Sequence, residues 1–391
     1  MNILHVYPYF YPAWSYGGVT RVSYEITKRL AERGHNVVVL TTDALDGHSR
    51  VQVKSNPTEH EGIRIFYLRN LSNTLSARCK LAIPTNFPAA FKGEIKDFDY
   101  IHIHGHRHAL SLIGYYYARK YDIPYLIQAH GDLPYANQKV AVKRIYDTII
   151  GRKILHCAQQ VIALNRTEYD CYKKMGVDES KIVIVPNGID EDISSKMLIK
   201  GQFREKYNIK ENEKIILYFG RIHKTKNIDM LVETFPQILS GIKVARLVIS
   251  GPDDGNLADL KQQVQSLGIA DRVIFTGYME DNEKYQVFLD SDVFVTPSFT
   301  GFPITFLESL LCGTPIITTA NGDNLDWIND NVGRVVNFST DELRDAIIRL
   351  LENDNLYKGY VENGQHMIKE TFTWNKVVDQ LERDCYKKMN L

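Results

Sequence analysis

Hydrophobic and polar residues near the N-terminus follow a pattern that predicts a strand, a helix and a second strand. Residues 3–7 are a short apolar run, typical of a buried strand. In residues 19–33 the apolar positions recur every three or four residues, as along one face of a helix, at Val19, Val22, Ile26 and Leu30. Residues 37–40 are a continuous apolar run, typical of a strand buried on both faces. Together these elements predict a right-handed β-α-β unit with parallel strands.

The same alternation predicts two successive groups of strands. The first group continues at residues 63–68, 100–103, 124–128, 160–164 and 182–185. A polar, lysine-rich stretch from about 191 to 214 then resembles an inter-domain connection. The second group comprises residues 215–219, 246–250, 272–275, 293–296, 315–318 and 334–336, with helical patterns between them at 257–267 and 341–351. The fold class predicted is therefore α/β, with two doubly wound parallel sheets.

Sheets of this class bind ligands beyond the carboxyl ends of their strands. The length of 391 residues is enough for two domains. We place the first domain at residues 1–190 and the second at 191–371, and we expect a cleft where the two sheets face each other. The motifs that follow predicted strands are therefore the first places to look for chemistry.

Composition narrows the class of protein. Apolar residues make up 44% and charged residues 24% of the chain, and the formal net charge is zero. A soluble globular protein fits these values, whereas nucleic-acid binding through bulk positive charge does not. The five cysteines are widely spaced and form no C-x-x-C pair, so we expect neither disulfides nor a zinc site, and a cytoplasmic location. We expect no signal peptide and no transmembrane segment.

The zero net charge hides a division along the chain. Residues 1–195 hold 24 Lys and Arg against 19 Asp and Glu, and the remainder holds 23 against 28. Between 139 and 166 only Asp147 opposes six cations, which are Lys139, Lys143, Arg144, Arg152, Lys153 and Arg166. One interpretation is a basic amphipathic helix on an anionic membrane. The other is a core-packed helix with a solvated outer face.

The segment after the strand at 215–219 has the residues of a phosphate clamp. Gly220 ends the strand, and Arg221 and Lys226 flank the loop that follows. Arginine is a planar fork and lysine a mobile point charge, so the pair suits a diphosphate. A solvated basic loop before a helix is the alternative. Gly251, in the turn at 250–255, is a second strand-end glycine, for which ordinary turn chemistry is the alternative.

Residues 298–315 run from a strand through a glycine turn into a short helix that ends at Gly313. The N-terminus of such a helix favours anions. Glu308 lies between Leu307 and Leu310 in the apolar run of this helix. A carboxylate there indicates a specific hydrogen-bonding role, such as holding paired hydroxyls, and a partly exposed helical glutamate is the alternative.

Two clusters in the first half have competing interpretations. Six aromatic residues follow the first strand, at Tyr7, Tyr9, Phe10, Tyr11, Trp14 and Tyr16. Their rings could hold a sugar or lipid acceptor, or pack the loop onto a helix. Four histidines alternate at His102, His104, His106 and His108. Histidines at such spacing can bind a metal, but no carboxylate or cysteine is interleaved, and we predict no metal site.

In the order and spacing of its motifs the chain resembles the retaining glycosyltransferases of family 4, which have the GT-B fold of two facing Rossmann-like domains. The resemblance covers nearly the whole chain. Besides the clamp and the Glu308 helix, it rests on Gly17-Gly18, residues 33–37, His102-Ile103-His104, His130-Gly131-Asp132, residues 185–190 and residues 267–278. Each motif alone is weak, and their combined order is specific.

The resemblance implies roles for individual residues. The donor, a UDP- or GDP-sugar, is held mainly by the second domain. Arg221 and Lys226 resemble the pair that neutralises its diphosphate in place of a metal, so neither a metal nor a cofactor is expected. Glu308 corresponds to the carboxylate that holds the ribose, and His130 to a histidine near the transferred sugar. The remaining donor-binding positions implied are Gly17, Gly18, Gly220, Gly251, Tyr278, Thr300, Gly301, Phe302, Pro303 and Ile304. Residues 372–391 are expected to return to the first domain.

One departure from the family pattern matters. The family has two glutamates eight positions apart, and Thr300 stands where the first is expected. Pro303 also removes a backbone N–H from the turn between them. A catalytically silent relative that binds a nucleotide sugar is therefore one alternative. An epimerase or hydrolase on the same scaffold is another, and it would need cleft carboxylates that the sequence does not identify.

The sequence thus predicts a retaining, metal-independent hexosyl transfer to a hydroxyl of a lipid-linked or glycan acceptor. The leaving diphosphate would help to deprotonate that hydroxyl. The basic stretch adds a peripheral contact with the inner face of the cell membrane as a further expectation. The sequence leaves open the nucleotide base, the transferred sugar and the identity of the acceptor.

Overall fold

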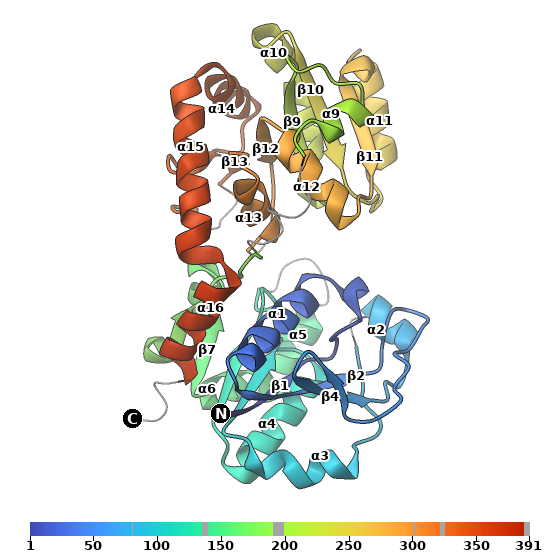
Figure 1. Ribbon diagram of the computed structural model, residues 1–391, viewed down its shortest axis with the longest axis vertical. Helices are drawn as coiled ribbons and strands as arrows, with labels where there is room; N and C mark the ends of the chain where they lie inside the picture. The colour runs from blue at the N-terminus through green and yellow to red at the C-terminus, as the bar shows by residue number, and fades with distance from the viewer. Residues whose placement is uncertain (80, 135–139, 191–198, 300–301, 321–324, 387–391) are drawn as a thin grey trace. The chain divides into compact units, whose positions relative to one another are not determined.

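The chain forms two compact units in a computed structural model that describes residues 1–79, 81–134, 140–190, 199–299, 302–320 and 325–386. Unit 1 comprises residues 1–188 and 374–391, and unit 2 comprises residues 189–373. Each unit is an α/β layer structure around one sheet (Figure 1), which confirms the predicted fold class. The observed divisions at 188/189 and 373/374 lie two residues from those chosen on the sequence.

The sheet of unit 1 has the order β3-β4-β2-β1-β5-β6-β7-β8. Its strands are β1 (Asn2–Val6), β2 (Asn36–Thr42), β3 (Thr58–His60), β4 (Ile63–Leu68), β5 (Tyr100–His104), β6 (Tyr125–Gln128), β7 (Gln160–Ala163) and β8 (Ile182–Ile184). Its helices are α1 (Gly18–Glu32), α2 (Asn73–Cys79), α3 (Ala89–Glu94), α4 (Ala109–Tyr121), α5 (Val140–Tyr146), α6 (Arg152–Cys157), α7 (Arg166–Lys174) and α16 (Trp374–Leu381). Short 3-10 or π turns are η1 (Trp14–Tyr16), η2 (Ile95–Asp97), η3 (Asp147–Gly151), η4 (Glu179–Lys181) and η8 (Glu382–Tyr386).

The edge strand β3 is the strand that sequence reasoning missed in unit 1. It pairs antiparallel with β4, whereas the other neighbouring strands of this sheet pair in parallel. The two strands are joined by Glu61 and Gly62, both of which have positive φ. Such a turn joins hairpin strands with the right twist. The sequence signal was a glycine preceded by glutamate rather than by the more usual asparagine.

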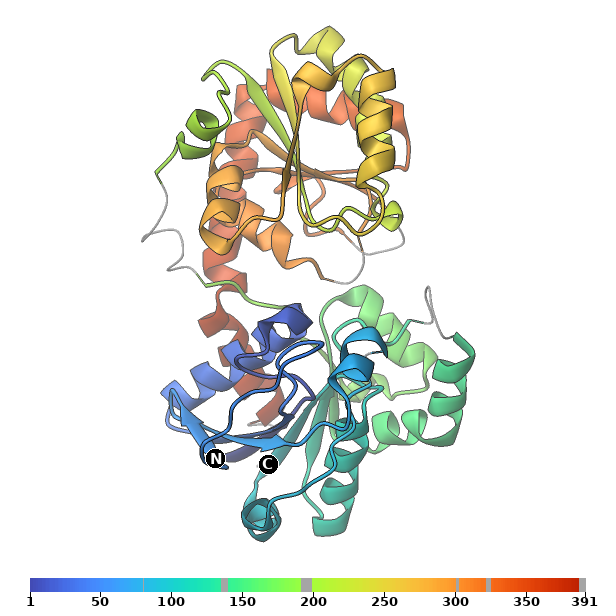
Figure 2. The ribbon, with the colours of Figure 1, turned by 90° about the vertical axis from the view of Figure 1, so that its right-hand side faces the viewer.

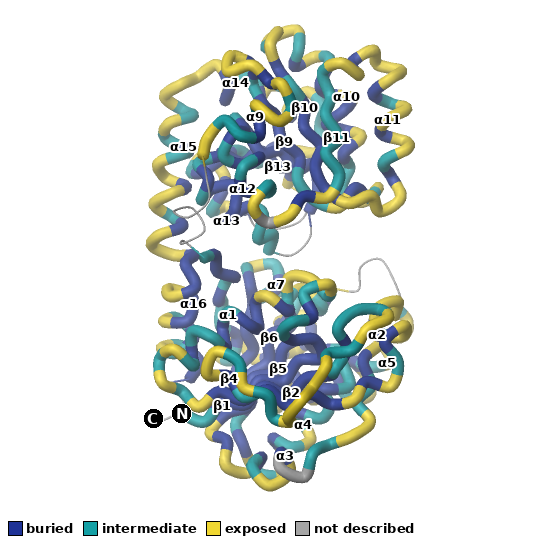
Figure 3. The backbone as a smooth tube through the Cα atoms, turned by 45° about the vertical axis from the view of Figure 1, so that its right-hand side comes forward, coloured by how far each residue is buried: buried dark blue, intermediate teal, exposed yellow. Residues whose placement is uncertain are grey.

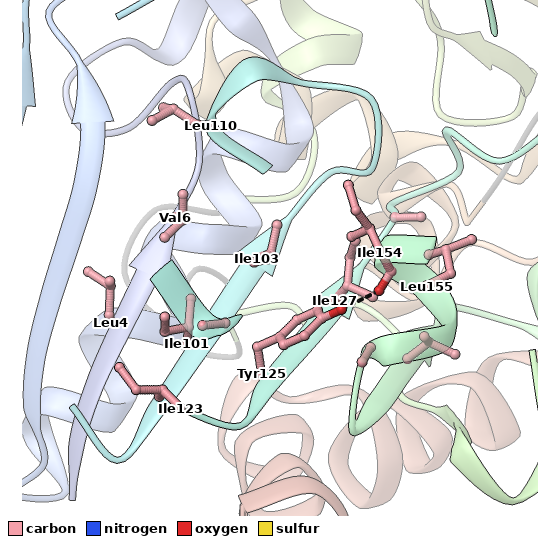
Figure 4. Close-up of a cluster of buried hydrophobic side chains, with 14 of the residues drawn as sticks. Leu4, Val6, Ile101, Ile103, Leu110, Ile123, Tyr125, Ile127, Ile154 and Leu155 are labelled. Atoms are coloured by element: carbon pink, nitrogen blue, oxygen red, sulfur yellow. Dashed lines mark hydrogen bonds between the residues drawn. The ribbon is translucent and has the colours of Figure 1, made fainter. Parts of the chain in front are cut away.

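Alternate residues of the central strands face opposite sides of the first sheet. Leu4 and Val6 of β1 join Ile101 and Ile103 of β5 in a buried apolar cluster, which Leu110 of α4 also enters (Figure 4). His5 lies between Leu4 and Val6 and therefore points to the other face. This alternation is what brings histidines from two strands together on one side of the sheet.

The C-terminal segment packs on unit 1. α16 lies against α1, and Arg33 at the end of α1 pairs with Asp379 at 2.8 Å and with Glu382 at 2.6 Å. Further along, the hydroxyl of Tyr386 is 2.7 Å from Nδ1 of His102. Trp374 begins the returning segment and contacts Gly188, where an added Cβ would come within 2.7 Å of the indole ring.

The sheet of unit 2 is parallel throughout, with the order β11-β10-β9-β12-β13-β14. Its strands are β9 (Lys214–Phe219), β10 (Ala245–Ser250), β11 (Val273–Gly277), β12 (Val293–Thr296), β13 (Ile316–Thr319) and β14 (Gly333–Val336). Its helices are α9 (Gln202–Lys206), α10 (Ile228–Gly241), α11 (Leu257–Ser266), α12 (Asp281–Asp290), α13 (Ile304–Leu311), α14 (Thr340–Glu352) and α15 (Asp354–Met367). Short turns are η5 (Lys224–Lys226), η6 (Ala270–Arg272) and η7 (Ile368–Phe372).

Helices cover both faces of the second sheet (Figure 2). Ile216 and Tyr218 of β9 belong to the cluster under α10, α11 and α14. Ile215 and Leu217 of the same strand belong to the cluster under α9, α12 and α13. A strand buried on both faces must be apolar throughout, which is why β9 was predictable from its composition alone.

The polar stretch before β9 is part of unit 2 rather than a free connection, in the portion from residue 199 that the structure describes. Asp290, at the end of α12, accepts hydrogen bonds from the N–H groups of Gly201, Phe203 and Arg204. Phe203 is buried in the core. Most residues around this anchor are charged or polar, which hides it in a composition count. For the described residues from 199 onward, the expectation of an inter-domain connection was wrong.

Burial follows this layer plan in both units, with dark strands inside and exposed helix faces and turns outside (Figure 3). All five cysteines are free thiols, as expected. Within the described ranges, none of the helices is both long and apolar enough to cross a membrane.

Candidate functional site

Two glycine turns meet at the carboxyl edge of the second sheet. The N–H of Gly220 donates to the carbonyl of Ser250 at 2.9 Å, and the N–H of Ile222 donates to the carbonyl of Pro252 at 2.9 Å. Gly251 has φ 139°, and a Cβ there would lie 1.9 Å from the carbonyl oxygen of Gly220. Gly251 is therefore required by the close approach of these two turns, and it fixes the start of the loop that carries Arg221.

The predicted clamp residues Arg221 and Lys226 occupy this loop. The guanidinium of Arg221 is largely exposed and pairs with Asp254 at 2.6 Å. Lys226 ends η5 and is half-buried. Burial first and the charge of Arg221 second lower the pKa of Lys226 below its usual value. No described carboxylate pairs with the Lys226 ammonium, so an anion placed beside both cations would relieve their repulsion.

Glu308 is buried on α13, and its carboxylate forms an ion pair with a lysine of α12. Its Oε1 accepts from Nζ of Lys284 at 2.8 Å and from the hydroxyl of Tyr285 at 3.4 Å, both from α12. The side chain of Glu308 is 9% exposed and that of Lys284 is 14% exposed. The exposed-glutamate alternative is therefore wrong. Glu308 is a fixed carboxylate at the sheet edge, and sequence reasoning missed its lysine partner.

The turn before α13 is described only from Phe302 onward, and Thr300 and Gly301 lie outside the described residues. The ring of Phe302 stacks on Trp327, with centroids 5.9 Å apart. Pro303 is the N-cap of α13 and Ile304 is its first residue, and no side chain caps the helix. Helix N-termini favour anions, and in this first turn the N–H of Phe306 already donates to the carbonyl of Pro303 at 3.1 Å.

Tyr278 follows Gly277 at the end of β11 and is 73% exposed. Gly277 has φ 74°, which turns the chain away from the sheet at this point. An exposed phenol at a strand end offers a face for stacking a base. The structure thus places Gly220, Arg221, Lys226, Gly251, Tyr278 and the Glu308 helix on one unit, after β9, β10, β11 and β12.

In unit 1, Gly17 and Gly18 follow β1. Gly17 has φ 96°, a conformation that favours glycine, and is the N-cap of α1, which begins at Gly18. Both glycines are exposed. No side chain caps the first turn of α1, so its free N–H groups have the same capacity to bind an anion as those of α13.

The aromatic loop between β1 and α1 is mostly packing. Tyr7, Tyr9 and Phe10 are buried, and Tyr9 stacks on Tyr16 with centroids 3.7 Å apart. Tyr11 is half-buried and stacks on His60 at 3.8 Å. The packing alternative therefore holds for the buried rings.

His130 follows β6 in a tightly held loop. Its φ is 54°, an uncommon conformation outside glycine that occurs more often for His, Asn and Asp. The N–H of the next residue, Gly131, donates to Glu168 at 2.6 Å. Burial lowers the pKa of His130 to about 3, so the imidazole is neutral at ordinary pH. The ring is turned toward His104, with Nε2 3.0 Å from Nδ1 of that residue.

Two buried charged groups that sequence reasoning missed hold this loop. Arg107 donates to both carboxylate oxygens of Asp147 and to the carbonyls of Asp132 and Leu133. Glu168 accepts from Gly131 and, at 2.8 Å, from the N–H of Leu164. Burial raises the pKa of Glu168 to about 7. The N-x-x-E pattern ending at Glu168 is a helix-start signal, but nothing local in it indicates the distant loop.

The predicted histidine cluster includes a residue from another strand. The ligand atoms of His5, His102 and His104 lie within 4.8 Å of one another, a spacing that a metal ion could use. His104, however, has both nitrogens in hydrogen bonds to other histidines, at 2.9 Å to His5 and 3.0 Å to His130. Burial lowers the pKa of His5 and His104 well below the usual value and that of His102 to about 3.

The basic segment of unit 1 turns an apolar stripe outward. Val142, Ile145 and Ile149 are 63%, 59% and 74% exposed. The one acidic residue described between 140 and 166 before α7, Asp147, is buried under the stripe and paired with Arg107. Arg152 and Lys153 are exposed beside the stripe, whereas Lys139 lies outside the described residues. The outer face of α5 and η3 is therefore apolar and basic rather than simply solvated.

Comparison with known protein families gives two matches that together span most of the chain. The family model described as "Glycosyltransferase Family 4" matches residues 16–193. The model described as "Glycosyl transferases group 1" matches residues 199–367. The first match lies almost entirely in unit 1 and the second in unit 2.

Two curated relatives are similar over most of their length. The alpha-monoglucosyldiacylglycerol synthase of Streptococcus pneumoniae is 28% identical over 298 residues, which are 71% of this chain and 67% of that protein. The UDP-Gal:alpha-D-GlcNAc-diphosphoundecaprenol alpha-1,3-galactosyltransferase of Escherichia coli is 26% identical over 339 residues, which are 84% of this chain and 85% of that protein.

A solved structure shares the whole fold. Anabaena HepE, in complex with UDP and glucose, superposes with a TM-score of 0.73 at 16% sequence identity, covering 100% of both chains. Together with the two parallel-sheet units, this likeness gives the chain the GT-B fold.

Proposed function

We propose that this chain, which belongs to glycosyltransferase family 4 and transfers a sugar from a nucleotide-sugar donor, does so with retention at the anomeric carbon and without a metal ion. The acceptor we propose is the hydroxyl of a lipid-linked molecule at an anionic membrane surface, on the cytoplasmic side. The donor is a UDP- or GDP-sugar. UDP comes first because one relative is named for UDP-Gal and HepE was solved with UDP.

The clamp geometry carries this proposal. Lys226 is half-buried beside Arg221 and has no carboxylate partner among the described residues. A leaving nucleoside diphosphate gains negative charge as its bond to the sugar breaks, and preorganised cations stabilise that charge. Arg221 and Lys226 supply such cations, so they can do the work that a divalent ion does at other phosphate sites.

The other donor contacts follow from position. Glu308 presents a fixed carboxylate for the ribose hydroxyls, and Tyr278 an exposed ring for the base. Gly17, Gly18 and the turn at 300–304 complete the donor site that the family resemblance implies. The same resemblance implies that His130 is the sugar-contacting residue of unit 1.

Retention is supported by the weakness of His130 as a base. The pKa of His130, lowered by burial to about 3, makes its imidazole a poor acceptor for a hydroxyl proton. In the proposed step the bond between the anomeric carbon and the diphosphate breaks, and the acceptor oxygen bonds to the same face. The acceptor proton passes to an oxygen of the leaving diphosphate. No covalent sugar–enzyme bond is needed.

The deciding experiment is a turnover screen of UDP-, GDP- and ADP-sugars with a soluble lipid-linked acceptor, with and without EDTA. We expect turnover with a UDP- or GDP-sugar, an unchanged rate in EDTA, and an α-linked product from an α-linked donor by NMR. An inverted product or loss of rate in EDTA would contradict the mechanism. Donor binding without turnover would instead favour the silent relative, and products formed without acceptor would favour an epimerase or hydrolase.

The exposed stripe Val142–Ile145–Ile149 supports the membrane part of the proposal. Each aliphatic side chain gains roughly 1–2 kcal/mol when it leaves water for the acyl boundary. Each nearby cation gains about 1 kcal/mol at an anionic surface. The two relatives named for a diacylglycerol and for diphosphoundecaprenol act on lipid-bearing molecules by name, and such acceptors are found at membranes.

Co-sedimentation with vesicles tests the stripe. We expect the protein to bind phosphatidylcholine vesicles that contain phosphatidylglycerol, to release them at high salt, and not to bind pure phosphatidylcholine. The triple variant Val142→Ser/Ile145→Ser/Ile149→Ser should bind at least about tenfold more weakly. The control Leu71→Ser/Leu75→Ser alters two other exposed leucines of unit 1 and should bind normally. Equal binding by the two variants, or binding that does not depend on salt, would refute the proposed membrane-binding surface. If a glycan acceptor without lipid were used equally well in the turnover screen, the proposed acceptor would be a glycan instead.

A further inference from the structure

Three histidines of unit 1 form a continuous hydrogen-bonded series that ends at the proposed sugar-contacting residue. Nδ1 of His5 is 2.9 Å from Nε2 of His104, and Nδ1 of His104 is 3.0 Å from Nε2 of His130. His5 and His104 are 0–1% exposed. The series therefore runs from the interior of the sheet to the loop after β6.

The strand register creates this series. β1 and β5 are parallel, with His5 opposite His102, and His104 is two residues further along β5. Side chains two residues apart on a strand point to the same face, so the rings of His5, His102 and His104 lie on one side of the sheet. His102 and His104 stack with ring centroids 4.2 Å apart. His102 itself is bound to Tyr386 and stands outside the series.

In a hydrogen-bonded series of neutral imidazoles, every ring must donate its N–H in the same direction along the series. Each neutral ring has one N–H donor and one lone-pair acceptor. If His104 accepts from His5 at Nε2, its proton is on Nδ1 and donates to Nε2 of His130. His130 must then carry its own proton on Nδ1. The reverse order is the only other arrangement that keeps both hydrogen bonds.

The two ends of the series decide between these orders. Nε2 of His5 and Nδ1 of His130 are both buried without a hydrogen-bond partner among the described residues. His5 is 1% exposed in the sheet interior, whereas His130 lies in a loop and is only half-buried, so an unpaired N–H is tolerated less at His5 than at His130. Nε2 of His5 is therefore the bare lone pair, and the proton order runs outward to His130.

We propose that His5 and His104 are positioning residues that hold His130 as the Nδ1–H tautomer and thereby fix the direction in which its ring meets the transferred sugar. This inference rests on the proposed function. The loop backbone is fixed independently, by Glu168 at Gly131 and by the hydroxyl of Tyr172, which accepts from the N–H of Ala129 at 3.0 Å. The series thus controls the ring of His130, and the loop contacts control its backbone.

The tautomer can be read in the free protein by NMR of ¹⁵N-histidine. We expect His5, His104 and His130 all to carry the proton on Nδ1. An Nε2–H form of any of the three would overturn the proposal. So would a joint shift of His5, His102 and His104 on adding Zn²⁺, because the cluster would then be a metal site. This arm needs no enzymatic turnover, so it stands even if the proposed transfer reaction is wrong.

The role in turnover is tested by a matched pair at His104. Asn places a hydrogen-bonding atom near the position of Nδ1, and Leu has the same shape without one. We expect His104→Leu to lower kcat by about tenfold, the rate equivalent of one buried hydrogen bond, with donor KM unchanged, and His104→Asn to recover most of that loss. His102→Leu, in the same buried cluster, should lose stability similarly but keep kcat. If the three variants lost kcat in proportion to their loss of stability, the role would be merely structural and the proposal wrong.

Discussion

The two units present their candidate residues in opposite electrostatic conditions. In unit 2 the guanidinium of Arg221 is 66% exposed and is already paired with an exposed carboxylate. In unit 1 the histidines around His130 are buried and neutral, because burial lowers the pKa of each of them. Unit 2 offers an exposed charge at Arg221, and unit 1 offers fixed hydrogen-bond directions.

Under the proposed function, this difference indicates what each unit would contribute to transfer. A charged clamp attracts a diphosphate over some distance and is weakened by salt. A neutral, buried series of histidines gives no long-range attraction. Its side chains are already fixed before a sugar binds, so it would contribute by orienting the sugar. Substitutions in unit 2 should therefore act on donor affinity with a salt dependence. Those in unit 1 should act on kcat or on stability.

The largest expected effect is the loss of the clamp. The double variant Arg221→Ala/Lys226→Ala removes two charge-assisted contacts worth about 3–6 kcal/mol together. Donor affinity should fall by a factor of ~10²–10⁴, measured by calorimetry with UDP-sugar. Lys224→Ala is the control, since Lys224 is exposed in the same turn and pairs with Asp259. Retained affinity in the double variant would show that the diphosphate binds elsewhere.

Most strands, and the position of Gly220, Arg221 and Lys226 directly after one of them, could be predicted from the sequence because their signals are local. β9 is apolar throughout, and Gly220, Arg221 and Lys226 follow it within seven residues. The partners of the site residues could not be predicted, because they come from distant positions. His5 and His104 are 99 residues apart, and Arg221 and Asp254 are 33 apart. A hydrogen bond across such a separation leaves no periodic pattern.

Glu308 differs from Arg221 and Lys226 because its side chain is buried and already paired. Glu308→Ala should destabilise the protein by about 3–5 kcal/mol, since it removes the buried carboxylate that pairs with the largely buried Lys284 ammonium at 2.8 Å. Urea denaturation should show Glu308→Ala/Lys284→Met recovering much of that loss. Glu283→Ala is the control on the same helix, where the pair with Lys206 is 40–54% exposed, and it should cost less than about 1 kcal/mol. No recovery in the double variant would mean that Glu308 is held mainly by other contacts.

Glu168 gives unit 1 a pH dependence of its own. Its pKa is raised by burial from 4.5 to about 7, so the folded state binds the proton more tightly than the unfolded chain. The resulting stability is present below pH 4.5 and is lost as the pH rises to about 7. Glu168→Gln cannot titrate and loses one backbone acceptor, so it should be less stable than wild type at pH 5.

Between pH 5 and pH 8 the stability gap between wild type and Glu168→Gln should shrink by about 2–3 kcal/mol, as followed by urea denaturation. Glu32→Gln, which replaces an exposed carboxylate at the end of α1, is measured alongside as the control for removing one surface charge. If the gap for Glu168→Gln widened with pH instead, the carboxylate would be stabilised as an anion by its two backbone N–H donors.

The smallest expected effect is a change in donor KM when Asp254 is replaced, and it tests whether unit 2 acts by charge rather than by positioning. Asp254 occupies Arg221 at 2.6 Å, so it competes with the diphosphate, and an exposed pair of this kind is worth less than about 1 kcal/mol. Asp254→Asn should therefore lower donor KM by up to about fivefold, with a smaller gain at high salt and no change in stability. Asp259→Asn, beside the exposed Lys224, is the matched control and should leave KM unchanged. A higher KM in Asp254→Asn would mean that Asp254 orients Arg221 rather than competing for it, and unit 2 would then position its ligand as unit 1 does.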